Sequence, residues 1–347
     1  MTPRHTQKSY PHPVITATKS FRAIPASDLP SLDLASELET HGYVLIRNLI
    51  PPADILPLLT DVTEVLNKAN WLAPRTNPTD RIANRAAACS EDDPNADYRE
   101  VRHNVFSLPR FQGLPHHPAL TAMMKQLTGP ELLILPRPAP RLIFPDYEPG
   151  IIHAHQDYNP AAGHHHTFTA WMPLHDCPIN QGPLRILEGS HRYGIQPDPT
   201  HTGFIPAGTE RGDAWAIGAI HAGDVLLFNN LTIHEAAPNT SNRLRLSLDC
   251  RFQSYLHPTD PALYTFVAGG GRSWESTYAN WPASYNHLKF YWTHLPLNFK
   301  PSIADLANLI QTAPSPRDRA RYANVLHQIT AQNFANTSST REPALQS

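Results

Sequence analysis

Residues 243–252 read Arg-Leu-Arg-Leu-Ser-Leu-Asp-Cys-Arg-Phe, and polar and apolar side chains alternate along the whole stretch. Successive side chains of a β-strand point to opposite faces, so this period of two predicts a strand with one polar and one apolar face. The polar face carries Arg243, Arg245, Ser247, Asp249 and Arg251. In an antiparallel sheet such a face ordinarily lies in water, and a face turned towards a ligand is the alternative.

Short strand-like runs recur before this stretch, separated by Pro, Gly and Asn, which favour turns. They are Leu132–Leu135, Arg141–Phe144, Ile151–Asp157, Thr167–Met172, Leu184–Leu187 and Asp224–Phe228. Many short strands with turn signals between them are typical of a β-sandwich or β-barrel. We therefore expect a β-core over residues 131–255.

Apolar residues at helical spacing flank this core on both sides. The expected helices are Pro30–Thr40, Ala53–Lys68, Pro118–Leu127, Ile303–Thr312 and Pro316–Phe334. Residues 70–115 are polar and rich in Pro, Asn, Asp and Arg, which predicts an irregular segment suited to a lid. The expected layout is a flexible N-terminal arm (1–27), a single domain (28–335, helical over 300–335) and a polar tail (336–347).

The composition argues against several classes of protein. The 347 residues carry a net charge of -2 with neutral histidines, so we expect no nucleic-acid partner. No apolar run reaches the roughly 18 residues that span a bilayer, and no secretory signal is recognisable. Three cysteines without a CxxC pair are typical of a reducing compartment. We expect a cytoplasmic protein without a membrane partner, with targeting to an organelle through the basic N-terminal arm as the alternative.

The candidate chemistry starts at His153-Ala154-His155-Gln156-Asp157. If this stretch is a strand, His153, His155 and Asp157 project from one face. A histidine and a carboxylate two residues apart can occupy adjacent positions around a metal ion. A second histidine from elsewhere then completes the 2-His-1-carboxylate site of non-haem iron(II) oxygenases. Because the chain holds 20 histidines, a chance motif in a turn is the alternative.

His234 is the candidate for the remaining ligand. It follows the apolar run Val225–Phe228, which places it near the end of a strand and at the rim of the expected core. Such a position is both rigid and open, although an isolated histidine is more often structural. On the next strand, Arg243 or Arg245 can bind a carboxylate with two parallel hydrogen bonds, and Ser247 can add a hydroxyl.

The order of these residues resembles the phytanoyl-CoA dioxygenase family. That family shows an HxD motif, a strand with Trp, an N-G-x-L and a P-G-S-H segment, a Gly-Asp pair, a distal His and an Arg eleven residues beyond it. The matching positions here are His155/Asp157, Trp171, Gln181–Leu184, Glu188–His191, Gly223-Asp224, His234 and Arg245. The spacing of eleven selects Arg245 over Arg243. The resemblance covers roughly residues 35–255.

The resemblance implies a mainly β fold with flanking helices, built on a double-stranded β-helix (a jelly roll, cupin-like). It implies Fe(II) on His155, Asp157 and His234, with 2-oxoglutarate and O₂ as co-substrates. Arg245 would bind the far carboxylate of 2-oxoglutarate, and Trp171 and Ser247 would line its site. The implied reaction oxidises, most simply hydroxylates, a small organic substrate, with decarboxylation of 2-oxoglutarate to succinate and CO₂. Specialised metabolism is one setting in which relatives act.

Several positions depart from the family pattern or add to it. Ala236 stands where the family often has a serine that contacts 2-oxoglutarate, so Ser247 or an upstream side chain would have to replace that contact. His153 is an extra histidine beside the motif, and we expect it to support the site or to have no role in it, rather than to bind metal. We expect His164-His165-His166 in an exposed loop and His191 in a structural turn.

Two other functions remain to be weighed. One is a metal-dependent hydrolase that binds zinc through the His-rich segments, and the other is a non-catalytic metal-binding jelly roll. Neither gives Arg245 a role. Asp157 further argues against halogenation, because related halogenases lack this carboxylate so that chloride can bind in its place.

The sequence determines neither the substrate nor the oligomeric state. Candidates for the substrate side are Arg137, Arg141, Tyr158, Tyr285, Phe290, Tyr291 and Trp292. The aromatic residues among them could equally form part of a hydrophobic core.

Overall fold

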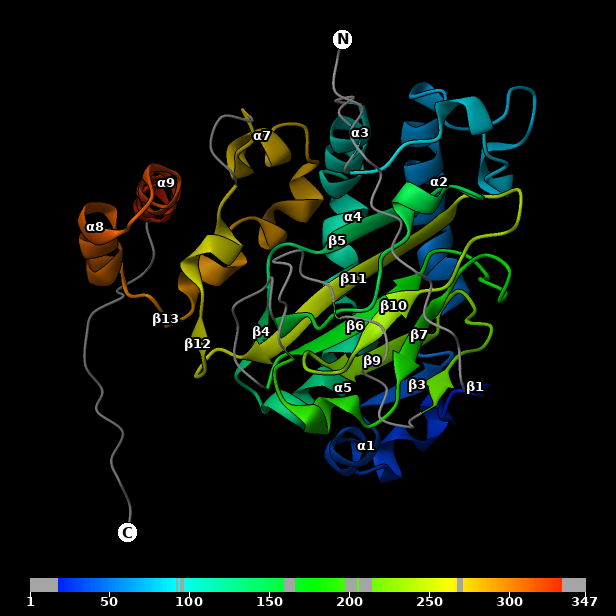
Figure 1. Ribbon diagram of the computed structural model, residues 1–347, viewed down its shortest axis with the longest axis horizontal. Helices are drawn as coiled ribbons and strands as arrows, with labels where there is room; N and C mark the ends of the chain where they lie inside the picture. Colours follow the sequence, from blue (N-terminus) through cyan, green and yellow to red (C-terminus); the bar gives the residue numbers. More distant parts are fainter. Residues whose placement is uncertain are drawn as a thin grey trace.

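A computed structural model describes residues 18–91, 93, 97–158, 166–196, 205, 214–266 and 271–332. Two β-sheets dominate it (Figure 1). The larger sheet has the order β2 (Ala23–Pro25), β3 (Tyr43–Arg47), β9 (Val225–Asn229), β6 (Phe168–Pro173), β11 (Arg245–Ser254) and β4 (Leu132–Ile134), and β5 (Ala139–Ile143) also pairs with β11. The smaller sheet has the order β1 (Thr18–Lys19), β8 (Trp215–Ala216), β7 (Leu184–Leu187) and β10 (His234–Ala236).

The chain crosses repeatedly between the two sheets. β6 lies in the larger sheet, β7 and β8 in the smaller, β9 in the larger, β10 in the smaller and β11 in the larger again. Antiparallel strands that alternate between two facing sheets form a jelly roll. The predicted mainly β fold, with a double-stranded β-helix core and flanking helices, is thus confirmed.

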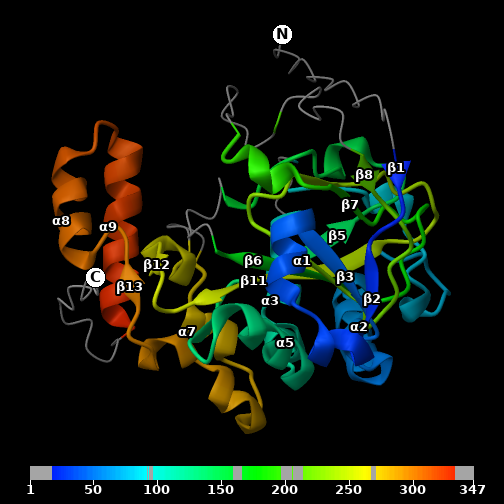
Figure 2. The same ribbon diagram turned by 90° about the horizontal axis from the view of Figure 1, so that it is seen from below.

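Helices cover the outer face of the larger sheet. They are α1 (Leu34–His41), α2 (Pro52–Lys68), α3 (Asp97–Phe106), α4 (Pro109–Gly113) and α5 (Pro118–Thr128). Their apolar residues share one core with Leu246, Leu248, Cys250 and Phe252 of β11. Figure 2 shows α2 and α5 on the side of the larger sheet that faces away from β7 and β8.

A second core fills the space between the two sheets. It joins Tyr43, Trp171 and Phe228 of the larger sheet to Leu184 and Ile186 of β7. β11 is therefore covered on both faces, and its polar side chains are turned inwards rather than into water. Arg245 is 0% and Asp249 4% exposed, so the interpretation of a solvated polar face is wrong.

Some expected elements differ from those observed. Residues 70–115 are not irregular throughout, because Tyr98, Val101 and Val105 recur at helical spacing and anchor α3 in the core. Short 3₁₀ helices fill other connections: η1 (Ala26–Ser31), η2 (Pro78–Asp80), η3 (Arg85–Ala87), η4 (Leu114–His116), η5 (Glu148–Gly150), η6 (Ser190–Tyr193), η7 (Pro261–Tyr264), η8 (Ala283–Leu288) and η9 (Tyr291–His294).

Of the expected arm (1–27) and tail (336–347), the structure describes only residues 18–27. Residues 18–25 of the expected arm pair in both sheets, through β1 with β8 and through β2 with β3. Residues 1–17 and the tail 336–347 lie outside the described residues.

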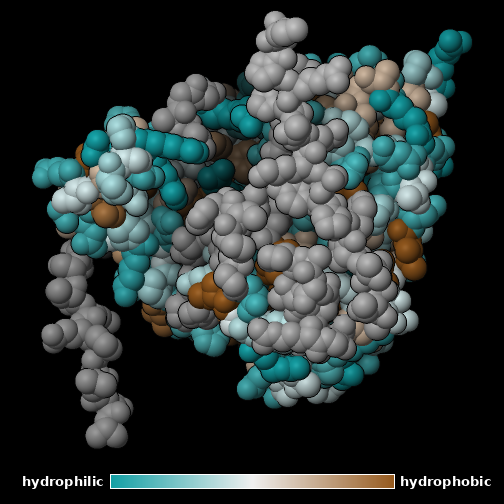
Figure 3. Space-filling model, viewed as in Figure 1, coloured by the Kyte–Doolittle hydropathy of each residue, from teal (hydrophilic) through white to brown (hydrophobic). Residues whose placement is uncertain are grey.

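The C-terminal part forms an aromatic cluster beside the core. It contains α7 (Trp274–Tyr278), the strand pair β12 (Pro258–Thr259) and β13 (Asn298–Phe299), α8 (Ile303–Thr312) and α9 (Pro316–Ala331). Ser302 and Ser315 cap α8 and α9 by accepting hydrogen bonds from Asp305 N and Asp318 N. The face of this helical pair in Figure 3 is mostly hydrophilic. No helix among the described residues combines the length and apolar character needed to cross a bilayer.

The turn before β9 gives a test of the fold. Gly223 has φ +96°, and a Cβ there would lie 2.2 Å from the carbonyl oxygen of Ile50. We expect Gly223→Ala to lower the free energy of unfolding by about 3 kcal/mol or more, because the clash with backbone adds to the conformational strain. Gly271 also has positive φ (+62°) but open space around its Cβ position, so Gly271→Ala should cost only about 1 kcal/mol. Equal losses in chemical denaturation of the two variants would contradict the steric argument.

Candidate functional site

Three side chains from separate parts of the fold meet between the sheets. His155 lies in the connection after β5, Asp157 follows it, and His234 begins β10. The Nε2 atoms of His155 and His234 each lie 3.9 Å from Oδ1 of Asp157. One ligand atom from each residue falls within 4.8 Å of the others, as a shared metal ion requires, and all three side chains are buried.

Backbone carbonyls orient both imidazoles towards this meeting point. Nδ1 of His155 lies 2.7 Å from the carbonyl of His153, and Nδ1 of His234 lies 3.0 Å from that of Thr232. These contacts favour the tautomer in which Nδ1 carries the proton, leaving the Nε2 lone pair for a metal. Burial, followed by the charge of His234, lowers the pKa of His155 to about 3, and burial also lowers the pKa of His234. Both rings are therefore neutral at neutral pH, as metal binding needs.

The HxD segment is not a strand, which corrects the expectation for Ile151–Asp157. Its backbone pairs with β10 at a single bridge, where the amides of His155 and His234 each donate to the other residue's carbonyl at 3.0 Å. Asp157 already lies in the turn that follows. The grouping of His155 and Asp157 therefore comes from tertiary contacts and not from strand alternation. His153 is not part of the ligand cluster.

Two residues of the larger sheet hold the Asp157 carboxylate. Thr169 Oγ1 donates to Oδ2 at 2.6 Å, and Arg251 Nη2 donates to Oδ1 at 2.7 Å. Thr169 and Arg251 face each other across β6 and β11, so the strand register brings both to the same carboxylate. Burial by itself would raise the pKa of Asp157, but Arg251, His234 and His155 together outweigh it and keep the pKa well below the ordinary value.

The charges continue along the inner face as an alternating row. Arg251 also lies 3.8 Å from Asp249. Arg141 of β5 then donates to both oxygens of Asp249, from Nε at 2.7 Å and from Nη2 at 2.9 Å. Burial would lower the pKa of Arg141, yet the Asp249 carboxylate raises it, so this guanidinium stays charged. The row Arg141–Asp249–Arg251–Asp157 is internally compensated.

Arg245 lies outside that row. Its Nη1 donates to Ser247 Oγ at 2.8 Å, whereas Nε and Nη2 have no hydrogen-bond partner in the part of the chain that the structure describes. Its guanidinium lies 5.7 Å from the centre of the Trp171 ring. Burial lowers the pKa of Arg245 to about 10, which leaves it charged at neutral pH. A buried cation with two unpaired nitrogens is a ready site for a carboxylate.

The structure separates the two candidate arginines clearly. Arg245 and Trp171 line an inner cavity together with both histidines, His155 and His234. Arg243 points to the outside, where Nη1 donates to the Asp80 carbonyl at 2.7 Å and lies 3.8 Å from the Asp80 carboxylate. Ala236, at the position of the family's serine, is buried in β10 and offers no hydroxyl.

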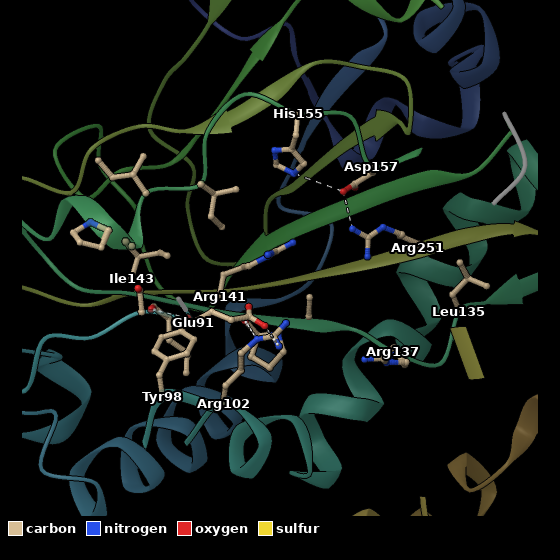
Figure 4. Close-up of a pocket in the computed structure, with 18 of the residues that line it drawn as sticks. Glu91, Tyr98, Arg102, Leu135, Arg137, Arg141, Ile143, His155, Asp157 and Arg251 are labelled. Atoms are coloured by element: carbon tan, nitrogen blue, oxygen red, sulfur yellow. Dashed lines mark hydrogen bonds and ion pairs between the residues drawn. The ribbon is translucent and has the colours of Figure 1, made fainter. Parts of the chain in front are cut away.

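A larger pocket of about 480 Å³ opens on the other side of the triad. His155 and Asp157 lie at one end, and Arg102, Arg137, Arg141 and Arg251 contribute guanidinium groups to its walls (Figure 4). Leu135, Leu142, Ile143, Ile151, Ile152 and Leu263 form apolar parts of the wall. Residues 70–115, expected to be suited to a lid, contribute Tyr98 and Arg102 of α3 to the wall of this pocket.

The residues proposed for the substrate side divide into two groups. Arg137 and Arg141 line the larger pocket. The aromatic residues pack in or against the C-terminal aromatic cluster and so belong to a hydrophobic core rather than to the pocket wall. They are Tyr285, Phe290, Tyr291 and Trp292. Tyr158 lines neither of the two cavities described above.

The other histidines singled out in the sequence are not ligand candidates among the residues that the structure describes. His191 Nε2 lies 2.8 Å from the Glu39 carbonyl, in the expected structural turn. His166 stacks on His257, with ring centres 5.7 Å apart, and His164 and His165 lie outside the described residues.

Sequence reasoning missed the roles of Thr169, Arg251 and Arg102. Arg251 had a signal, because it shares the polar face of its strand with Arg245 and Asp249. No feature of the sequence pointed to Thr169, since a threonine in an apolar strand is ordinary.

Comparison with known proteins gives a family for the chain. The family model described as phytanoyl-CoA dioxygenase (PhyH) matches residues 38–247. Among curated proteins, the peroxisomal phytanoyl-CoA dioxygenase of Bos taurus is 21% identical over 266 residues, which cover 67% of this chain and 72% of that protein.

Solved structures with a related arrangement include two enzymes of nogalamycin biosynthesis. The non-heme α-ketoglutarate-dependent epimerase SnoN has a TM-score of 0.47 and 20% identity, over 71% of this chain and 90% of that chain. The non-heme α-ketoglutarate-dependent carbocyclase SnoK has a TM-score of 0.46 and 20% identity, over 65% of this chain and 86% of that chain.

The hydrogen bond from Thr169 offers a test of how the site is held. We expect Thr169→Val, which keeps the side-chain shape but removes the donor to Asp157, to weaken Co(II) or Fe(II) binding by about tenfold. Thr169→Ser keeps the hydroxyl and should bind within about threefold of the parent affinity. Competition titration with a metal chelator measures both, with circular dichroism as the control for folding. Unchanged affinity in Thr169→Val would show that the bond does not position the carboxylate.

Proposed function

The chain belongs to the phytanoyl-CoA dioxygenase family, and on this premise we propose that it hydroxylates a small organic substrate. It is a 2-oxoglutarate-dependent non-haem iron oxygenase. In the proposed reaction one atom of O₂ enters the substrate, and 2-oxoglutarate is decarboxylated to succinate and CO₂. The observation that carries the proposal is the buried His155–Asp157–His234 cluster beside the unpaired guanidinium of Arg245.

The donor set fits ferrous iron. Two neutral imidazoles and one carboxylate form the 2-His-1-carboxylate set, which leaves further coordination positions open for co-substrate and oxygen. We assign His155, Asp157 and His234 as the ligands. Arg251 and Thr169 would keep Asp157 ionised and oriented. The carbonyls of His153 and Thr232 would hold the two rings.

The surroundings of Arg245 fit one end of a dicarboxylate. We assign this guanidinium as the group that binds the far carboxylate of 2-oxoglutarate. Ser247 accepts a hydrogen bond from the guanidinium and would orient it, and Trp171 would form the adjacent wall. The inner cavity holds only about 10 Å³, so its lining side chains have to move apart to admit the co-substrate. Because Ala236 offers no hydroxyl, Ser247 is the replacement closest to Arg245.

The bound iron supplies, with 2-oxoglutarate and O₂, the oxidising power to cleave an unactivated C–H bond. The protein's own residues bind, orient and exclude water. Both histidines and Asp157 are at least nine-tenths buried, and the apolar side chains Phe228 and Leu184 close the inner cavity. The proposal needs no separate general base.

The rival functions explain less. A zinc hydrolase or a non-catalytic binding protein has no use for a fully buried cation with two unpaired nitrogens, because burial without a partner is costly. Asp157 favours hydroxylation over halogenation, since it would occupy the iron position that chloride takes in related halogenases. A place in specialised metabolism stays a prediction from the sequence resemblance.

We also infer that the protein works in the cytoplasm. Cys89, Cys177 and Cys250 are all unpaired thiols, and two of them are buried. Free thiols without a disulfide are typical of a reducing compartment.

A spectroscopic experiment tests the metal assignment. Under anaerobic conditions, Fe(II) plus 2-oxoglutarate should give a weak visible charge-transfer band with the parent protein. His234→Ala should abolish the band because it removes one ligand, whereas His191→Ala, outside the cluster, should retain it. A folded parent protein without the band, or a band that survives in His234→Ala, would contradict the assignment.

The two neighbouring arginines give a matched pair for the co-substrate. We expect Arg245→Gln to raise the KM for 2-oxoglutarate by at least about tenfold, because charge-assisted hydrogen bonds are lost. Arg243→Gln should change it less than about twofold, since Arg243 bonds to Asp80 on the outside. Succinate formation measures both variants, and equal effects would mean that the assignment of Arg245 is wrong.

A further inference from the structure

The larger pocket contains one guanidinium that the compensated row does not neutralise. Arg141 and Arg251 pair with Asp249 and Asp157, and Arg102 lies 3.6 Å from Glu91. Arg137 has no carboxylate within ion-pair distance in the part of the chain that the structure describes. Three of the four pocket arginines thus have an acidic partner, and Arg137 is left as a net positive charge.

The surroundings of Arg137 hold it in place without using up its donors. Nη1 donates to the Thr265 carbonyl at 3.0 Å, and the guanidinium lies 5.7 Å from the centre of the Phe266 ring. The other four of its five N–H groups have no partner among the described residues. Pro136 and Pro138 flank it and restrict the backbone of the β4–β5 connection, which makes this segment rigid.

The position of Arg137 relative to the triad suits substrate rather than co-substrate. It is solvent-accessible and lines the larger pocket, whereas Arg245 lines the inner cavity. In the view of Figure 4, Arg137 lies beside Leu135 and on the far side of Arg251 from Asp157. A molecule that reached from Asp157 to Arg137 would pass Arg251 (Figure 4), and the pocket wall also offers it apolar side chains.

We propose that Arg137 binds an anionic oxygen group, a carboxylate or a phosphate, of the substrate. The substrate is then a small amphipathic anion, whose apolar part contacts residues such as Leu135, Ile152 and Leu263 and presents a C–H bond to the triad. A pocket of about 480 Å³ suits a small molecule. The identification of this anion as the substrate rests on the proposed function, but binding of an anion at Arg137 does not depend on iron.

The chemistry of the guanidinium explains the selectivity for an anion. Its planar donors match two oxygens of one carboxylate or phosphate, and the pair is stronger where water is partly excluded. Desolvation in the pocket, followed by the charges of Arg102 and Arg251, lowers the pKa of Arg137 from its ordinary value. The negative charge of an incoming anion would offset both effects, whereas a neutral amide carries no charge to offset either.

Binding to the metal-free protein tests the proposal separately from catalysis. The probes are octanoate, octyl phosphate and the neutral octanamide, together with 3-phenylpropanoate and its amide, measured by isothermal titration calorimetry. We expect at least one anion of each shape to bind about tenfold or more tightly than the matching amide. Tighter binding of octyl phosphate points to a phosphate on the substrate, and tighter binding of octanoate points to a carboxylate.

Four variants locate the site. Arg137→Gln should reduce anion affinity about tenfold and leave amide affinity unchanged, and Arg137→Lys should recover part of the loss. Arg85→Gln, which changes a surface arginine paired with Asp146, should bind like the parent. Arg245→Gln should also leave anion binding intact, because it alters the co-substrate side. A failed charge-transfer experiment together with intact anion binding would therefore count against the iron site alone.

Three results would overturn the proposal. They are an absence of anion binding to the parent protein, equal affinity for anion and amide, and loss of anion binding in Arg245→Gln but not in Arg137→Gln. Should Arg137→Gln fail to fold, Arg137→Lys and the comparison of acid with amide in the parent decide the matter.

Discussion

The central constraint in this protein is that β11 is buried on both faces. Its apolar side chains pack against the helices, and its polar side chains point into the space between the sheets. Charged groups in such a place are costly unless they are paired, so the inner face has to carry a compensated network. Arg141, Asp249, Arg251 and Asp157 form that network, and the position of the candidate metal-binding carboxylate follows from it.

Asp157 links this network to the candidate metal site. One of its oxygens accepts a hydrogen bond from Thr169, and the other faces Arg251 and both histidines. The single backbone bridge between His155 and His234 brings the second sheet to the same point. A short irregular segment is thus tied to both sheets, by the Asp157 side chain to β6 and β11 and by the His155 backbone to β10.

The two cavities next to the triad differ in their unpaired charge. The inner cavity contains Arg245, whose free nitrogens are fully buried, and the outer pocket contains Arg137, which remains accessible. Arg141 and His155 line both cavities, so they mark the boundary between them. Under the proposed function, this division would separate a site for the small dicarboxylate from a site for the larger substrate, with His155 at both.

The alternation of β11, most of the strands and flanking helices, and the candidates His155, Asp157 and His234 could be predicted from the sequence by itself, because periodicity and motif spacing are local properties of the chain. The choice of Arg245 over Arg243 came from the family that the sequence resembles. The sequence could not show that Ile151–Asp157 is not a strand, because that depends on pairing at one residue with β10. Nor could it show that α3 forms a wall of the pocket, or that Thr169 and Arg251 share one carboxylate. Those facts arise only when strands distant in sequence come into register, since hydrogen bonds and charge pairs depend on distances in space and not along the chain.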